Sequence, residues 1–194
     1  GTIYPISRSH DEILGRRCHK SIDDVPEKVD LAILIIPAEF IPDTLARCGE
    51  LGVRAAQILT SGFAEEGGGE GAAVQAEIRA IAEGYDMAVM GPNSEGFANC
   101  TTALCPTFSP AVDKTELPLL PPWRKDGHIA AIAQSGGMGF AFYDHGRPKE
   151  LPFNYIVTTG NEACIETLDV VEYLLDEGKT DAFILFMEDV KRGE

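Results

Sequence analysis

The sequence predicts an α/β fold made of two consecutive units, each a parallel sheet with helices on both faces. Short apolar runs alternate with segments of helical periodicity along most of the chain, which is the pattern of βαβ units. A proline-rich stretch at 101–126 interrupts this alternation once, and the pattern resumes after it. We therefore expect a first domain at 1–100, a linker at 101–126 and a second domain at 127–194.

Apolar runs predict four strands in the first domain, and helical spacing predicts two helices between them. The strands are expected at 2–6, 31–36, 55–60 and 87–90, and the helices near 39–51 and 70–84. Each run ends in a turn-forming sequence, namely "PISRS", "IPAEF", "TSGFAEEGGGEG" and "GPNSEG". Because ligands of open α/β sheets bind outside the carboxyl ends of the strands, these four loops should form one ligand-binding edge.

The second domain begins with an apolar run at 128–133 and a helix from about residue 136. A strand at 155–160, a helix near 165–177 and a strand at 182–187 follow. The prolines of the preceding linker cannot lie in a helix interior or a central strand. Three strands are fewer than the roughly five or six of a doubly wound domain, and the chain starts without Met. We therefore expect a piece of a longer protein.

The composition argues against several classes of protein. A formal charge of -15 repels phosphate backbones, so we expect no nucleic-acid partner. The longest apolar stretch, at 31–36, is far shorter than the roughly 20 residues that span a bilayer, so we expect no membrane association. The sequence shows no secretory signal, and its cysteines lack CxxC spacing. This predicts a cytoplasmic protein with reduced thiols and no metal site.

The stretch "AIAQSGGMGFA" at 131–141 joins a predicted strand to a predicted helix through Ser135 and two glycines. A serine nucleophile would need a later acid and then a later histidine, but only His145 follows, adjacent to Asp144 on the same helix. A dinucleotide fingerprint fails because its third glycine would fall on Phe142. Two interpretations remain. Either the N–H groups at the helix start bind an anion, or the glycines allow close packing.

Seven separated motifs occur in an order and spacing that resemble the NDP-forming acyl-CoA synthetases, the superfamily of the succinyl-CoA synthetase alpha subunit. The motifs are "IYPISRSHDEILG", "VDLAILIIPAEFIPDTL", "ILTSGFAEEG", "GPNSEG", "AQSGGMGFA", "TTGNEA" and "LFMEDVKRG". The resemblance implies a Rossmann-like CoA-binding domain followed by a partial flavodoxin-like succinyl-CoA synthetase domain. It implies that a small carboxylic acid, CoA and ATP give acyl-CoA, ADP and phosphate, through acyl phosphate and phosphohistidine intermediates.

The same resemblance implies that coenzyme A binds this chain, whereas ATP and Mg²⁺ bind an ATP-grasp beta domain or subunit. We also expect an oligomer. The family's first strand and its glycine-rich turn would precede Gly1, and the phosphorylated histidine would follow Glu194. None of the four histidines, His10, His19, His128 and His145, matches a catalytic position. This chain alone should therefore be inactive.

Residue by residue, the resemblance assigns CoA binding to three loops and substrate binding to the next turns. The CoA set is Pro5, Ser7, Arg8, Pro37, Ala38, Glu39, Leu59, Thr60 and Ser61, and the substrate set is Asn93, Ser94, Phe140, Asn161 and Glu162. The catalytic set is Ser135, Gly136, Gly137 and Glu188, with Asp189 as the alternative acid. Arg8 suits a CoA phosphate because its guanidinium donates two hydrogen bonds at once. Glu95 departs from the family, and its carboxylate would repel a second negative charge on the substrate.

Two other functions compete with the ligase. A CoA-binding regulatory module of a protein acetyltransferase-type fusion would keep CoA binding without ligase chemistry. An NAD-binding Rossmann protein would need a G-x-G-x-x-G turn upstream of this chain and an acid at the end of the next strand, where "PISRS" offers Arg8 and no acid.

Overall fold

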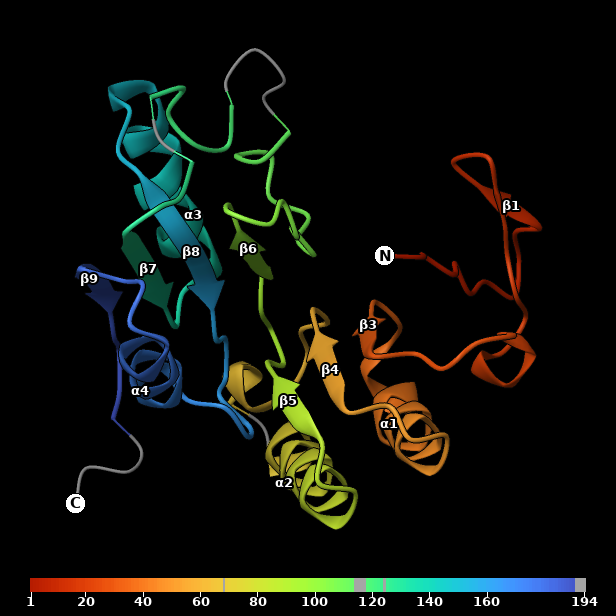
Figure 1. The fold of residues 1–194 in the computed structure, drawn as a ribbon. Coiled ribbons are helices and arrows are strands. Elements are labelled where there is room, and N and C mark those ends of the chain that lie inside the picture. The colour runs from red at the N-terminus through yellow and green to blue at the C-terminus, as the bar shows by residue number, and fades with distance from the viewer. Residues whose placement is uncertain (68, 114–117, 124, 191–194) are drawn as a thin grey trace.

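The computed structural model describes residues 1–67, 69–113, 118–123 and 125–190. Two larger sheets organise this part of the chain: β3-β4-β5, which is parallel, and β6-β8-β7-β9, which is mixed (Figure 1). This arrangement confirms the predicted α/β class. Within the described residues, none of the helices combines the length and the apolar composition that crossing a bilayer demands.

The first sheet holds β3 (Leu31–Leu34), β4 (Ala55–Ile58) and β5 (Ala88–Met90). Helices α1 (Ile41–Glu50) and α2 (Gly69–Gly84) connect these strands and share one core with them. Ile41, Leu45 and Ile78 of the helices have no exposed surface, nor do Ile58 and Val89 of the strands. Burial of such side chains contributes about 1.5–3 kcal/mol each. The predicted strands at 31–36, 55–60 and 87–90 are therefore confirmed, each slightly shorter than expected.

The strand predicted at 2–6 does not form. In the described chain this segment makes only a single bridge, from Ile6 to His19, and a short hairpin follows. The hairpin pairs β1 (Glu12–Ile13) with β2 (Arg16–Arg17). Ile3 stays 64% exposed. Apolar residues form a strand only where a neighbouring strand accepts their backbone hydrogen bonds, and no strand of the first sheet lies beside this segment.

The second sheet holds β7 (Ile129–Ala133), β8 (Phe153–Thr158) and β9 (Ala182–Phe186), all parallel. Helix α3 (Gly136–Gly146) packs on one face with Phe140 and Tyr143, while α4 (Thr167–Glu177) packs on the other with Leu174. Successive side chains of β7 point to opposite faces of the sheet, so this strand contributes to both cores. Ala131 packs in the core with α3, and Ile132 packs in the core with α4. These elements match the predicted ones.

A strand that the sequence pattern did not predict completes this sheet. β6 (Phe97–Asn99) follows β5 directly but pairs antiparallel with β8, so the chain crosses from one sheet to the other (Figure 1). The described part of the predicted linker packs against α3. Tyr143 donates its hydroxyl hydrogen to the carbonyl oxygen of Leu119 at 2.9 Å, and Arg147 donates to that of Ala111 at 2.6 Å.

Within the described residues, four short 3-10 helices lie between the main elements. They are η1 (Ile22–Asp24), η2 (Ala38–Phe40), η3 (Ala64–Glu66) and η4 (Arg147–Lys149). Of these, η2 and η3 follow the carboxyl ends of β3 and β4, so they lie in the loops that were expected to bind ligand.

Candidate functional site

A cleft of about 470 Å³ lies where strand ends of the two sheets meet. Most of its lining comes from the loops after β4, β5, β7, β8 and β9, all at carboxyl ends of strands, and Phe108 from the segment after β6 adds to it. It gathers these residues of the predicted sets: Leu59, Ser61, Asn93, Ser94, Ser135, Gly136, Gly137, Asn161 and Glu188. The sequence motifs from both halves of the chain therefore converge on one place, as expected for ligand binding in α/β sheets.

The start of α3 forms one wall of the cleft. Ser135 is the N-cap residue, with extended backbone angles, and its side chain makes no capping hydrogen bond. The first N–H groups of a helix have no partner within the helix, and the helix dipole adds positive potential there. A Cβ on Gly137 would meet no atom within 4 Å, so this end of the helix is open to a ligand. The arrangement suits an anion such as a phosphate or a carboxylate.

Of the two adjacent acids after β9, Glu188 rather than Asp189 lines the cleft. The Asp189 carboxylate instead accepts a hydrogen bond from the N–H of Val190 at 2.8 Å. The backbone N–H groups of both acids donate to the amide oxygen of Gln134, at 2.6 and 3.0 Å. Tertiary structure thus separates two adjacent acids that sequence alone left equivalent.

Asn93 and Asn161, both predicted to contact substrate, bond to each other. The Asn93 amide donates to the Asn161 side-chain oxygen at 3.2 Å. The Asn161 amide in turn donates to Glu65 and to Gln75, the latter at 3.2 Å. Burial opposes ionisation of Glu65, but hydrogen bonds from Asn161 and from backbone N–H groups outweigh it and hold the pKa of its carboxyl below its ordinary value. These side chains therefore form a hydrogen-bonded network that joins the two halves of the chain at the cleft.

Two residues of the predicted substrate set do not line the cleft. Phe140 is only 2% exposed because its ring packs in the core between α3 and the second sheet. Glu162 is also 2% exposed, and its carboxylate accepts hydrogen bonds from Thr159 and Thr167. Ser94 does reach the cleft wall, but it is equally buried and donates its hydroxyl hydrogen to the carbonyl oxygen of Thr158 at 2.6 Å.

The residues expected to bind CoA lie in the loops after β3 and β4 and in the segment before β1. Of these, Leu59 and Ser61 line the cleft. Thr60 donates its hydroxyl hydrogen to the carbonyl oxygen of Ile36 at 2.7 Å, which joins the two loops. The Arg8 guanidinium lies 5.9 Å from the ring centre of Phe40, at the end of η2.

The remaining CoA residues are outside the cleft wall. They are Pro5, Ser7 and Arg8 before the hairpin, Pro37, Ala38 and Glu39 at η2, and Thr60. The Arg8 contact places the first of these segments beside the second, so the three loops still form one edge.

The sequence patterns missed several cleft residues. Glu65, Phe108, Gln134 and Gly160 line it without having been assigned a role. Glu65, Gln134 and Gly160 each lie within one of the seven motifs, so their place in the sequence could have indicated them. Phe108 lies in the proline-rich stretch, where no pattern predicted a contribution to the site. Within the described residues, no group of three or more His, Cys, Asp or Glu side chains is placed to hold a metal ion.

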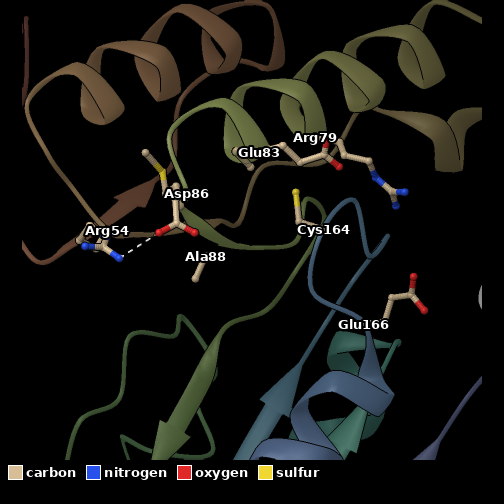
Figure 2. A pocket seen from close by; sticks show the side chains of 9 residues that line it. Arg54, Arg79, Glu83, Asp86, Ala88, Cys164 and Glu166 are labelled. Carbon is tan, nitrogen blue, oxygen red and sulfur yellow. Dashed lines mark hydrogen bonds and ion pairs between the residues drawn. The ribbon is translucent and has the colours of Figure 1, made fainter.

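A larger hollow, of about 640 Å³, lies near the amino ends of β4 and β5 (Figure 2). Both of its arginines already have partners, because Arg54 pairs with Asp86 at 3.2 Å and Arg79 donates to the carbonyl oxygen of Ala163 at 2.6 Å. Burial raises the pKa of the Cys164 thiol to about 11, which disfavours the reactive thiolate. Although this hollow is larger than the cleft, it has fewer groups that could bind or react with a ligand.

Comparison with known protein families identifies the family to which this fold belongs. A family model described as a CoA binding domain matches residues 1–99, and one described as a succinyl-CoA ligase like flavodoxin domain matches residues 126–194. The chain belongs to the CoA-binding domain family. In this chain the CoA-binding domain is followed by the ligase-like flavodoxin domain, and the predicted resemblance is confirmed.

Similar proteins cover the whole chain. The alpha subunit of an ADP-forming acetate–CoA ligase from Pyrococcus furiosus is 34% identical over 193 residues, which are 100% of this chain and 39% of that protein. An ADP-forming acetate–CoA ligase from Methanocaldococcus jannaschii is 36% identical over 191 residues, 98% of this chain and 25% of the relative. This chain thus spans well under half the length of these relatives.

Solved structures agree with these relatives. A crystal structure from Pyrococcus horikoshii OT3 superposes with a TM-score of 0.85 at 34% identity, covering 98% of this chain and 41% of that one. An acetyl-coenzyme A synthetase from Ca. Korarchaeum cryptofilum gives a TM-score of 0.81 at 29% identity, covering 98% and 38%. Both comparisons extend over the two domains and the stretch between them.

Proposed function

We propose that this chain is the CoA-binding part and the first ligase part of an NDP-forming acyl-CoA synthetase. The full protein would join a small carboxylic acid to CoA, with ATP consumed and ADP and phosphate released. One observation carries the proposal: motifs from both domains line a single cleft that combines an open helix start with the carboxylate of Glu188. The relatives named ADP-forming acetate–CoA ligases support this activity.

In this proposal the two domains have different functions. Residues 1–100 bind CoA, residues 101–126 link the domains, and residues 127–194 begin the ligase domain. Arg8 holds a CoA phosphate, while Leu59 and Ser61 lie where the CoA chain enters the cleft. The combination of an apolar and a hydroxyl side chain at this place suits pantetheine, which has both apolar and amide groups.

The chemistry at the cleft follows from its groups. The N–H groups at the start of α3 stabilise negative charge on a phosphate, either on the acyl phosphate or on the phosphohistidine. The CoA thiol attacks the acyl phosphate, which forms the thioester and releases phosphate. Glu188 orients the histidine, because a carboxylate beside an imidazole fixes its tautomer and stabilises its protonated form.

Other parts of the protein supply what this chain lacks. No described histidine lines the cleft, so the phosphorylated histidine belongs to another segment. ATP and Mg²⁺ bind an ATP-grasp beta domain or subunit, whether fused or separate. All five cysteines lie within the described residues as free thiols, which fits a cytoplasmic protein.

Ligand binding and turnover in the parent protein test this function. Calorimetry should show binding of CoA and none of NAD, and the reverse would overturn the assignment. The parent protein should convert acetate or longer acids to acyl-CoA with ATP and Mg²⁺, and labelled ATP should leave an acid-labile, base-stable phosphate on a histidine. Binding of CoA without turnover or label would instead favour the regulatory module.

Glu188→Gln tests the role given to the acid. Turnover should fall on the order of 100-fold with CoA affinity retained, since the change removes a charge at the reacting groups. Asp189→Asn is the matched control and should keep turnover near that of the unchanged protein. Equal losses in both variants would contradict the assignment of the acid to Glu188.

A further inference from the structure

The side chain of Gln134, directly after β7, joins three segments of the cleft. Its amide oxygen accepts from the backbone N–H groups of Glu188 and Asp189, at 2.6 and 3.0 Å. Its amide nitrogen donates to the carbonyl oxygen of Asp189 at 2.7 Å and to the Glu162 carboxylate at 2.8 Å. Both ends of this amide therefore contact the turn that carries Glu188, and all four distances are those of well-formed hydrogen bonds.

The buried Glu162 determines which way the Gln134 amide points. The other oxygen of this carboxylate accepts from the Thr159 hydroxyl at 2.8 Å and from the N–H and hydroxyl of Thr167, both at 2.7 Å. An ionised carboxylate can only accept hydrogen bonds, so the end of Gln134 that faces it must be the nitrogen. The amide oxygen then has to face the N–H groups of residues 188 and 189. Glu162 is itself held by the start of α4, where Thr167 is the first helical residue.

The Glu188 side chain has little else to fix its position. Residues 187–190 follow β9, an edge strand, and belong to no helix or strand. Glu188 is exposed, and within the described part of the chain its carboxylate forms no hydrogen bond or ion pair. The direction of this carboxylate therefore depends on its backbone, and that backbone is attached to the fold through Gln134.

We propose that Gln134 is a positioning residue for the ligase reaction, which holds Glu188 in the cleft and is itself oriented by the buried Glu162. This inference rests on the proposed function and adds to it a route from the start of α4 to the reacting groups. Glu162 then acts through Gln134 and does not touch the substrate, which accounts for its burial in a motif that resembles a substrate-binding one.

Hydrogen exchange tests the positioning without any enzymatic activity. In the 194-residue chain, Gln134→Ala should speed exchange of the Glu188 and Asp189 amides by at least about tenfold, because both lose their acceptor. Amides in β7 and β8 should be unaffected. Unchanged exchange at 188 and 189 in a folded variant would overturn the proposal.

Turnover of the parent protein tests the consequence for catalysis. Gln134→Ala should lower kcat by about 10- to 100-fold with KM for CoA unchanged, since a misplaced group costs rate more than binding. In a Glu188→Gln background the same change should cause little further loss, because the group that it positions is already absent. Additive losses would show a purely structural role and would overturn the proposal.

A swap of the two side chains tests the role of Glu162. Gln134→Glu removes the donor and sets a second carboxylate against Glu162, so kcat should fall. Adding Glu162→Gln returns one donor to the pair and should restore part of that loss. If the double variant is no better than Gln134→Glu alone, Glu162 does not orient residue 134.

Asn154→Ala is the matched control. Asn154 also uses its amide to hold backbone beside β9, donating to the carbonyl oxygen of Lys179 at 3.3 Å, but at the far end of the sheet. This variant should lose stability and keep kcat. A parent protein that forms no acyl-CoA at all would overturn the proposed function, whereas an active one that is indifferent to Gln134→Ala would overturn only the positioning role.

Discussion

At the residue scale, Glu95 sets the charge of the cleft beside the start of α3. A Cβ on Gly136 would lie 2.8 Å from the Cβ of Glu95 and 3.1 Å from one of its carboxylate oxygens, so only glycine fits there without displacing Glu95. Within the described residues, no hydrogen bond or ion pair to this carboxylate is formed. Its negative charge is therefore available to act on a substrate.

Glu95→Gln should broaden the choice of acid. Two unit charges about 4 Å apart repel by about 1 kcal/mol in water and about 4 kcal/mol near a protein surface. The variant should therefore raise kcat/KM for succinate relative to butyrate by roughly fivefold or more. The two acids match in length and differ in one charge, so steady-state assays of both isolate the effect. Glu83→Gln, in the hollow near the amino ends of β4 and β5, serves as the control, and an unchanged ratio in Glu95→Gln would contradict the role.

At the element scale, the crossing of β6 into the second sheet depends on a small polar cluster. The Ser94 hydroxyl donates to the carbonyl oxygen of Thr158 and accepts from the N–H of Gly96 at 3.0 Å. The Thr158 hydroxyl accepts from the N–H of Glu95 at 3.0 Å and donates to the carbonyl oxygen of Gly96 at 2.7 Å. Gly96 has a φ of 112°, which other residues rarely adopt. The turn before β6 is thus fixed to the end of β8.

Ser94→Ala should lower the free energy of unfolding by about 1–3 kcal/mol, because the buried carbonyl oxygen of Thr158 loses the Ser94 donor, although the N–H of Gly96 keeps the Thr158 hydroxyl as an acceptor. Urea unfolding followed by circular dichroism measures this change. Ser61→Ala is the matched control, since Ser61 lines the same cleft but is exposed, and it should change stability by less than about 0.5 kcal/mol. Equal effects of the two substitutions would contradict the importance of the cluster.

At the scale of the whole molecule, the Asn161 side chain ties the two sheets together. It follows β8 of the second sheet, yet its partners Glu65 and Gln75 belong to η3 and α2 of the first unit. Gly160 next to it packs directly on the chain after β5, where a Cβ would lie 2.2 Å from the carbonyl oxygen of Pro92. The cleft exists only while these two loops stay together.

Asn161→Asp should loosen this junction in a pH-dependent way. The pKa of Glu65 is lowered in the folded chain, so its ionised form stabilises the fold at neutral pH, and this stabilisation is lost as the pH falls through the lowered pKa. An aspartate at 161 removes the donor and adds a like charge, which raises the pKa of the pair and reverses the effect. Tm should therefore fall at pH 7 and begin to recover as the pH drops through this raised pKa, above the ordinary carboxyl value of about 4. Asn161→Ala, which adds no charge, is the control and should show no such recovery.

The sequence alone predicted the elements that depend on local patterns. The helices α2 and α4 and the strands β3, β4, β7 and β9 appear where periodicity and turn residues placed them. The motif at Ser135 was also assigned to a strand-to-helix turn with an open helix start, as found. The local sequence suffices to predict these features because hydrophobic periodicity and helix capping depend on residues that are close together in the chain.

Other features depended on contacts between distant segments. Residues 2–6 have the apolar pattern of a strand but no neighbouring strand, whereas β6 has a weak pattern and a ready partner in β8. Whether a segment forms a strand depends on a neighbouring strand with which it can pair, and a local sequence pattern does not reveal that neighbour.

The sequence by itself determined the α/β class, the family and the loops that form the cleft. Tertiary structure decided which polar side chains of those loops face the cleft and which hold it together. Glu162 and Glu188 are both acids in motifs of the site, yet one is buried among hydroxyl and amide donors and the other points into the cleft. The physical reason is that a buried carboxylate requires donors from several segments at once, and only the fold brings Thr159, Thr167 and Gln134 to the same place.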